Sequence, residues 1–448
     1  MKRGDATLPS EREFIGPMVQ NRTLKRLDQG QLDQAVRRHE MFRNARVGGA
    51  RANLSFCDLS GLDLAGRDLA HADFVGCSLR GANLAGARLD CASFFVADLR
   101  QANFDGASLI KADLRGACLR GAILVGANLF EADLRDGSLA EKDRSGHLRM
   151  VQIDANPAEA DGADLSGANL TNARMSGVMA IHTDFSDAVM RGCKLVRATM
   201  RGANFTGSNL EGADLSGADM RGACLRGAVL TGATMMLTDL TDADVEEALT
   251  DKPVGRVVAE LGRSLDDLLA DHMAWVGSSG AQGTMLDLSG FDLRHAPSLA
   301  HVCLTMLRAA GATLYGLDLT GVQLQAAVLD NADLRGATLN DGDLRGIGLR
   351  HAKLNNANLR NVNLRPLVFD EQRSRPADLS GAKLRYADLS GASLRAVNLG
   401  NADLSFANLR GCDLTRTDLT GAKLFGAKVE RRALTEGAIL DGVAGLKL

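Results

Sequence analysis

The sequence is poor in aromatic residues and has no long apolar run. Its 448 residues include one Trp, two Tyr and 14 Phe, although 45% of all residues are hydrophobic. A globular core of this size would use more large rings, so the apolar side chains, mostly Leu and Ala, indicate a narrow interior. No stretch has the length of a membrane-spanning helix, and the first residues lack the apolar segment of a signal peptide. We therefore expect a cytoplasmic protein without membrane contact.

Motifs for metals, cofactors and catalysis are also missing. The eight Cys form no C-x-x-C pair and no ligand-like spacing with the eight His, so no metal site is predicted. Phosphate-loop, zinc-protease and serine-hydrolase signatures do not occur, so we predict no cofactor, no catalytic residue and no enzyme activity. The formal net charge of −3 is close to neutral, which disfavours a nucleic-acid partner.

A five-residue repeat fills most of the chain, and Ala112–Gly137 shows it most clearly. A small residue is followed by a polar one, then Leu, then two mostly hydrophilic residues. This period fits neither a helix nor an alternating strand. It fits a four-sided coil with Leu and the preceding Ala inside, stacked by backbone hydrogen bonds at about 4.7–4.9 Å. Gly at the last position, as in Gly116 and Gly121, relieves each turn.

Some cysteines follow the repeat, because they occupy the slot that Ala usually fills. We expect them to be small buried core residues in a reducing compartment. They are Cys57, Cys77, Cys193 and Cys412.

The units Ala112–Gly116, Ala213–Gly217 and Ala402–Phe406 carry a resemblance to a known family. Each reads Ala, Asp, Leu and two variable residues, and the chain resembles the pentapeptide-repeat family over most of its length. The resemblance implies an all-β solenoid, a right-handed quadrilateral β-helix. The gyrase-protecting members of that family mimic DNA with a uniformly acidic rod and dimerise through a C-terminal element. This chain departs from them in its Arg-rich units and in a C-terminus, 436–448, without an obvious dimer helix.

Two helical stretches divide the repeats into two arrays. Apolar residues at three- and four-residue spacing predict one helix over 23–46 and a second beginning at Pro253. Leu32, His39 and Phe42 in the first helix match Leu265, His272 and Trp275 in the second, which indicates a tandem of related modules. We expect both histidines to pack or cap rather than bind metal, and both aromatic residues to anchor the helices to the first coil.

The segmentation follows from these breaks. We expect two repeat solenoids, each preceded by a helical cap that covers its open end. The predicted segments are a loose arm at 1–19, a helical cap at 20–50, a first solenoid at 51–247 with a loop at 141–161, a helical linker or cap at 248–284, a second solenoid at 285–430 with a loop at 365–376, and a tail at 431–448.

Arginines twenty residues apart are expected to stack in columns on one face. Such columns are able to bind phosphate or an acidic partner, and the alternative is a solvated face neutralised by nearby Asp, which we favour. The possible interaction surface comprises Arg80, Arg100, Arg120, Arg115, Arg135, Arg201 and Arg221. The acidic group from Asp239 to Glu247 also has two interpretations. It is either a docking site for a basic partner or a set of acidic residues that favours the start of the helix after it.

The function that these features favour is a non-enzymatic protein–protein interaction scaffold with flat solenoid faces. The sequence names neither the partner protein nor the oligomeric state. One alternative, from the family resemblance, is a DNA-mimicking modulator of a DNA-binding enzyme such as gyrase. Another is an enzyme with its site in the break at 141–161 or at the junction of the modules.

Overall fold

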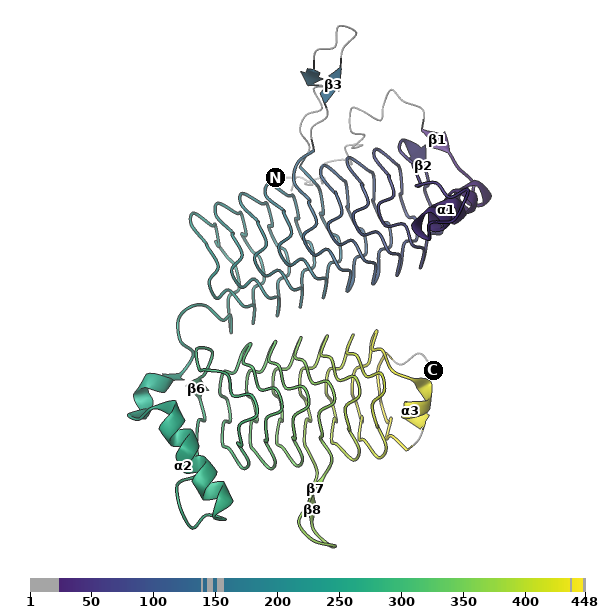
Figure 1. Cartoon of the computed structure of the whole chain (residues 1–448). Coiled ribbons are helices and arrows are strands. Elements are labelled where there is room, and N and C mark those ends of the chain that lie inside the picture. The colour runs from purple at the N-terminus through teal and green to yellow at the C-terminus, as the bar shows by residue number, and fades with distance from the viewer. Residues whose placement is uncertain (1–23, 138–139, 143–147, 151–156, 436, 446–448) are drawn as a thin grey trace, which may run out of the picture. The chain divides into compact units, whose positions relative to one another are not determined.

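A computed structural model describes residues 24–137, 140–142, 148–150, 157–435 and 437–445. The chain divides into two compact units, Met1–Thr250 and Asp251–Leu448 (Figure 1). The two predicted loops fall inside these units rather than between them. Each unit is described below by itself.

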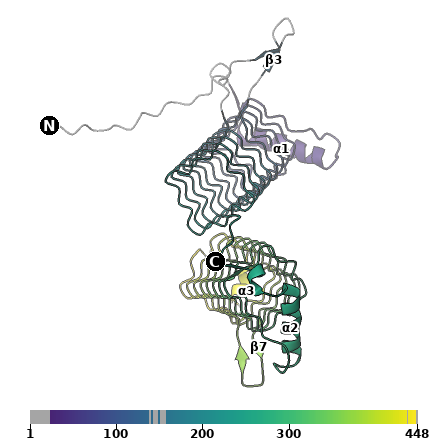
Figure 2. The ribbon, with the colours of Figure 1, turned by 90° about the vertical axis from the view of Figure 1, so that its left-hand side faces the viewer.

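Both units are stacks of coils that close every twenty residues. Parallel β-bridges join residues one coil apart, such as Asn53 to Asp73 and Asp58 to Ser78, and they recur every five residues along each coil. Leu84 N donates to Asn103 O at 2.6 Å, and Asn83 N donates to Leu62 O at 2.9 Å. The four-sided coil predicted from the repeat is therefore confirmed. Each side is so short that it usually forms one bridge rather than a strand, and the turns repeat almost identically (Figure 2).

The interior of each stack is built from the two inward positions of the repeat. The central Leu or Phe and the Ala two residues before it are almost completely buried, as at Ala92 and Phe94. Phe94 stacks on Phe74 with ring centroids 4.8 Å apart and meets Phe104 edge-on at 6.0 Å. The core is narrow because small residues alternate with large ones, as the scarcity of aromatic residues predicts.

The cysteines in the Ala slot behave as predicted, with one exception. Cys77, Cys193 and Cys412 are buried, whereas Cys57 is only partly buried in the first coil. Cys77 Sγ donates to Leu54 O at 2.6 Å, and burial raises the pKa of its thiol to about 12. All eight cysteines of the sequence lie in the described residues as free thiols.

The corners of the coils need a left-handed backbone. Gly is common there, as at Gly116 with φ of 64°, but larger residues also adopt this conformation, as Phe406 does with φ of 60°. A Cβ atom on Gly426, one coil later, would lie 2.5 Å from the Phe406 ring. The missing side chain of such a glycine is what makes room for the larger corner residue beside it.

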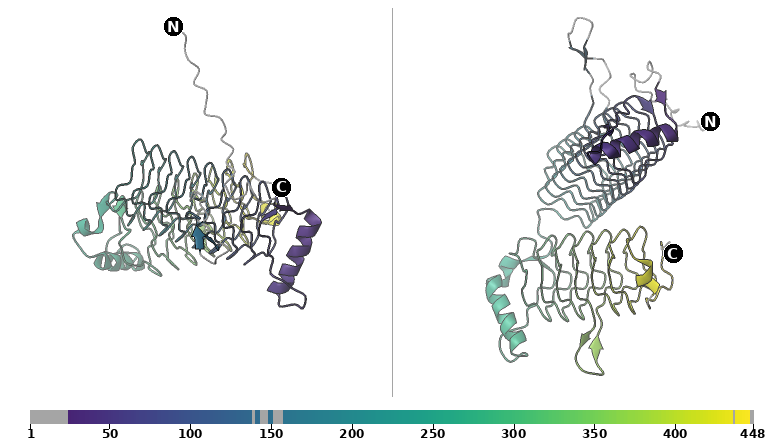
Figure 3. Two further views of the ribbon diagram at one scale, coloured as in Figure 1. Left: turned by 90° about the horizontal axis from the view of Figure 1, so that it is seen from above. Right: turned by 45° about the vertical axis from the view of Figure 1, so that its right-hand side comes forward.

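The first helix is shorter than predicted. Residues 25–26 form strand β1 (Lys25–Arg26), which pairs in parallel with β2 (Cys57–Asp58), and α1 covers Gln29–Arg43. Asp28 starts the helix because its carboxylate accepts from Gln31 N at 2.8 Å. Helix α1 lies across the N-terminal end of the first stack (Figure 3). It buries Leu32, Val36 and His39 there.

The second helical segment is interrupted, so the prediction of one helix from Pro253 is wrong. Strand β5 (Arg256–Val257) pairs with β6 (Phe291–Asp292), and a single 3-10 turn, η1, covers Val258–Leu261. Gly262 ends that turn with φ of 69°. Ser264 then caps α2 (Leu265–Gly277) by accepting from Asp267 N at 3.1 Å.

The matching histidines attach both helices to the first coil. His39 Nδ1 accepts from Ala52 N and His272 Nδ1 accepts from Leu286 N, each at 3.0 Å, and both side chains are fully buried. The predicted packing role is confirmed. Phe42 lies 6.2 Å from the His39 ring but is 47% exposed, so its role as an anchor stays a prediction. Trp275 is half-buried and stacks on His272 at 6.0 Å.

Both predicted loops contain antiparallel hairpins inserted at a corner of an uninterrupted stack. In the first unit the bridge partners become 41 residues apart, as for Ile123 and Asp164, around β3 (Ala140–Lys142) and β4 (Leu148–Met150). The repeat resumes at Ala158, so the break predicted at 141–161 ends too late. Much of that break lies outside the described residues.

In the second unit the hairpin pairs β7 (Leu367–Val368) with β8 (Ser374–Arg375) and projects from the stack (Figure 1). The slip predicted at Pro297 is confirmed, because Asp292 pairs with Thr313 one residue out of step. A short helix, α3 (Arg431–Thr435), follows the last full coil. Among the described residues, no helix has the length and apolar character that a membrane crossing requires.

Candidate interaction surface

The arginines of the repeat are held by the aspartate two residues before them. Asp98 Oδ1 accepts from the backbone N of Arg100 at 3.2 Å, and its carboxylate also accepts from the guanidinium Nε and Nη2 at 2.8 and 2.5 Å. Asp and Arg flank the inward Leu, so both side chains point outward on the same side of the coil. The Asp-Leu-Arg sequence therefore forms its own ion pair.

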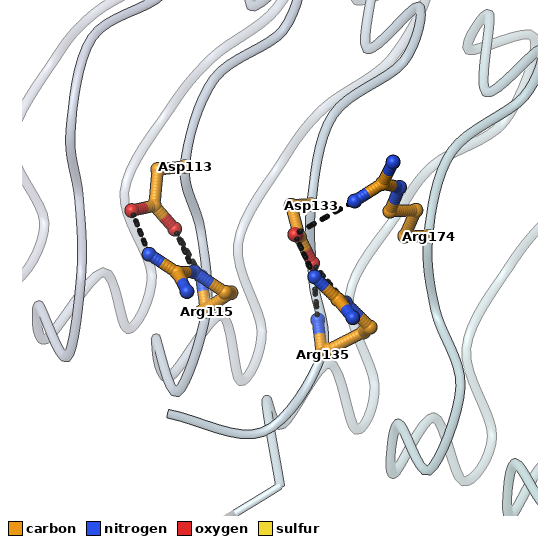
Figure 4. A network of polar contacts seen from close by, with 5 residues as sticks. All are labelled: Asp113, Arg115, Asp133, Arg135 and Arg174. Atoms are coloured by element: carbon orange, nitrogen blue, oxygen red, sulfur yellow. Dashed lines mark hydrogen bonds and ion pairs between the residues drawn. The ribbon is translucent and has the colours of Figure 1, made fainter. Parts of the chain in front are cut away.

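Most of the predicted Arg columns are neutralised in this way. Asp113–Arg115 and Asp133–Arg135 repeat the geometry one coil apart, and Arg174 approaches Asp133 from the next coil at 4.0 Å (Figure 4). Burial raises the pKa of the Asp133 carboxyl, but hydrogen bonds from Arg135 outweigh it and leave that pKa below its usual value.

The remaining predicted arginines also find carboxylates, with one exception. Arg221 and Arg201 both bind Asp219, at 2.8 and 2.5 Å. Arg120 lies 3.7 Å from the buried Glu159. Only Arg80, among the seven predicted residues, forms no ion pair with a described residue. The solvated, self-neutralised face thus accounts for the columns, and their role as an interaction surface stays a prediction.

The acidic group near the end of the first array is partly paired as well. Arg221 lies 3.4 Å from Asp239, and Arg226 binds both Asp244 and Glu246. The chain beyond it does not enter a helix directly, so the prediction that these acids precede a helix is wrong.

The described residues contain no cluster of side chains arranged for metal binding. No group of three or more His, Cys, Asp or Glu there is arranged to hold a metal ion. One hollow of about 270 Å³ opens beside the base of the first insertion. Its lining residues are Arg135, Asp136, Pro157, Ser176, Gly177 and Arg197. This lining contains neither His nor Cys.

The most exposed aromatic side chain on a projecting element was not predicted as a site. Val368 and Phe369 in the β7–β8 hairpin are 67% and 61% exposed. Asp370 orders the turn, because its Oδ1 accepts from Arg373 N at 2.8 Å and its carboxylate pairs with the Arg373 guanidinium at 2.6 Å. An apolar Leu-Val-Phe run between two prolines, outside the repeat, is the sequence signal that could have found it.

The base of this hairpin is fixed to the stack. Arg375 Nη1 donates to Ala326 O at 3.2 Å. A side chain on Gly346 would meet Leu367 Cβ at 2.9 Å and Arg375 O at 3.0 Å, so this glycine provides the space in which the hairpin sits. The exposed residues are thus presented from a rigid support.

These features define a class, the β-helical solenoids with five-residue sides. The family model for pentapeptide repeats matches residues 50–136, 158–249, 310–365 and 377–431 in overlapping segments, which is more than half of the sequence. The chain belongs to the pentapeptide-repeat family, whose members form right-handed quadrilateral β-helices.

Several solved structures are similar in part. The pentapeptide-repeat protein Rfr23 from the cyanobacterium Cyanothece 51142 is 29% identical over 30% of this chain and 91% of its own, with a TM-score of 0.27. HetL from Nostoc sp. strain PCC 7120, involved in heterocyst differentiation regulation, is 22% identical over 90% and 96% of the two chains, with a TM-score of 0.16. QnrB1, a plasmid-mediated fluoroquinolone resistance protein, is 21% identical over 48% and 99%, with a TM-score of 0.25. No curated protein matches the chain.

Proposed function

We propose that this protein is a non-enzymatic scaffold for protein–protein interaction, made of two repeat arrays that each begin with a helical cap. Residues 51–247 and 285–430 form the arrays, and α1 and α2 shield their first coils. The observation that carries the proposal is the pre-organised β7–β8 hairpin, which exposes Val368 and Phe369. The free cysteines fit a reducing, cytoplasmic setting.

The hairpin has the properties of a binding hot spot. Large apolar side chains on a protruding element lose water when a partner covers them, and an aromatic residue contributes most. The turn locked by Asp370 and Arg373 and the base fixed by Arg375 lower the entropy lost on binding, since the hairpin is already ordered.

The test is capture of partners from the native cell with the full-length chain. The substitutions Val368→Ser and Phe369→Ser together should lower recovery of the specific partner by about tenfold or more, since hot-spot residues contribute more than about 1.4 kcal/mol each. Met236→Ser with Leu237→Ser is the matched control, because these residues of the first unit are 70% and 92% exposed and make a similar change in exposed apolar surface.

The control should capture the partner as the unaltered chain does. Equal recovery with the hairpin variant, or no partner enriched above background by the unaltered chain, contradicts the proposal.

The DNA-mimic alternative receives no specific support from the side chains. A DNA mimic needs rows of unpaired carboxylates, whereas Asp98, Asp113, Asp133 and Asp219 are each bound by a guanidinium. We therefore expect no effect of the protein on gyrase supercoiling at micromolar excess. A clear inhibition or protection in that assay would favour the alternative.

A further inference from the structure

One face of the second unit carries aromatic rings and cations on three successive coils. Its sides are centred on Leu384, Leu404 and Leu424, and parallel bridges join Lys383 to Asp403 and Asp403 to Lys423. Phe406 N donates to Phe425 O at 2.7 Å, which places these residues side by side in neighbouring coils. The aromatic–basic stripe is defined as Lys383, Arg385, Tyr386, Phe406, Lys423 and Phe425.

The rings of the stripe are stacked along the axis of the solenoid. Tyr386 and Phe406 lie with centroids 4.9 Å apart and planes 4° apart. Phe406 also lies beside Gly426 of the next coil, where a Cβ atom would come within 2.5 Å of the ring. Tyr386 and Phe406 are both half-buried, and one face of each ring is covered by the other ring. Phe425 is 50% exposed beside them.

The two lysines of the stripe differ from arginines of the Asp-Leu-Arg units such as Arg100 and Arg115, which are paired with an aspartate. Lys383 and Lys423 are exposed and form no ion pair with any residue that the structure describes. Asp403, the carboxylate between them, lies 3.8 Å from Arg385. Arg385 in turn lies 5.8 Å from the centroids of both stacked rings. The two lysines therefore keep an unbalanced positive charge next to an apolar surface.

We propose that the aromatic–basic stripe docks an acidic polypeptide segment that carries aromatic or aliphatic side chains. Lysine ammonium groups attract carboxylates, and both Lys383 and Lys423 are exposed. Phe425 supplies an apolar contact, which adds to the binding free energy that the charge attraction provides. The proposal rests on the proposed scaffold function and adds the chemical class of a partner.

The geometry favours an acidic polypeptide over a single-stranded nucleic acid. Sequence-independent binding of single strands uses ring faces on which bases stack. In the stripe, the faces of Tyr386 and Phe406 are turned toward each other, and Phe406 lies beside Gly426. A carboxylate needs only the exposed ammonium groups of Lys383 and Lys423.

The test uses the full-length chain and a fluorescently labelled random copolymer of glutamate and tyrosine, with fluorescence anisotropy as the readout at low salt. We expect saturable binding that Lys383→Glu with Lys423→Glu weakens by about tenfold or more. Phe425→Ser should weaken it several-fold without a change in charge. Binding should also fall as salt is raised.

The matched control is Lys111→Glu with Lys194→Glu, two lysines of the first unit whose side chains are each 56% exposed. This variant has the same net charge as the stripe variant and should bind as the unaltered chain does. Circular dichroism checks that all variants keep the fold.

Absence of saturable copolymer binding, or an equal loss in the stripe and control variants, overturns the proposal. Tighter binding of a labelled oligothymidylate through the same lysines also overturns it in favour of nucleic acid. Because the copolymer replaces the natural partner, failure here leaves the hairpin experiment, and thus the scaffold function, intact.

Discussion

The ion pair within an Asp-Leu-Arg repeat is solvated at some positions of the stack and buried at others. Asp113 and Arg115 form their pair on an open face, with side chains 30% and 43% exposed. Asp292 and Arg294 use the same geometry at the start of the second array, but their side chains are 4% and 3% exposed. There Arg294 Nη2 also donates to Lys252 O at 3.0 Å, and Asp292 accepts from Val254 N at 2.9 Å. The buried pair thus binds the segment that leads into the second array.

The prediction at this scale compares the loss of stability when arginine is replaced by alanine in the buried pair and in the solvated pair. Arg294→Ala should destabilise the second unit by about 3–5 kcal/mol, because it leaves Asp292 buried without its cation. Arg115→Ala should cost less than about 1 kcal/mol, because that pair is solvated. Hydrogen exchange read by mass spectrometry should show faster exchange over 251–257 in the first variant only. Equal protection of residues 251–257 in both variants would show that the Asp292–Arg294 pair does not hold this segment in place.

At the scale of elements, buried histidines attach α1 and α2 to the coils. Burial lowers the pKa of His272 below its ordinary 6.5, with a weaker opposing effect from the backbone of Thr305. A neutral Nδ1 must accept from Leu286 N, so protonation removes this bond. The unfolded histidine binds a proton below about pH 6.5. The stability that it contributes is therefore complete above that pH and declines as the pH falls toward the lower folded pKa.

Trp275, the one tryptophan of the chain, stacks on His272 and reports the docking of α2. We expect the urea midpoint of its fluorescence to fall between about pH 7.5 and about pH 5.5. His272→Gln should have a lower midpoint at the higher pH and a smaller pH dependence. His71→Gln, at an exposed position of the first unit, is the control and should keep the original slope. A slope that survives in His272→Gln would refute this assignment.

Some elements could not be predicted from the sequence pattern. The loss of the repeat predicted the breaks at 141–161 and 365–376, but the hairpin in the second break depends on anchors elsewhere in the chain. Gly346 and the Ala326 carbonyl, which receive the second hairpin, look like ordinary repeat residues in the sequence. The same limit applies to Gly262, whose left-handed backbone divides the expected second helix.

At the scale of the whole molecule, the two units have separate hydrophobic cores. One core includes Phe94 and the other includes Leu354, both fully buried. In a solenoid each coil contacts mainly its neighbours, so a defect spreads along its own stack. The units should therefore respond separately to core substitutions.

Phe94→Ala should cost about 3–5 kcal/mol, because it leaves a cavity against Phe74 and Phe104. Hydrogen exchange should then accelerate in the first array and stay unchanged over 285–430. Leu354→Ala should cost about 2–5 kcal/mol and have the reverse pattern. Loss of protection in both arrays from either substitution would show that the units unfold as one.

The sequence by itself determined the coil, because a five-residue repeat of Ala and Leu has one economical way to bury both positions. It also located the matching histidines, since their spacing repeats in two helices. Tertiary structure alone decided how the charged side chains pair. Whether an Arg is neutralised, as Arg135 is, or a lysine is left unbalanced, as Lys423 is, depends on which side chains the stacking of coils brings together. Residues that lie one coil apart in space are twenty or more residues apart in the chain. The alignment of neighbouring coils, rather than the local sequence, therefore decides which charged side chains meet.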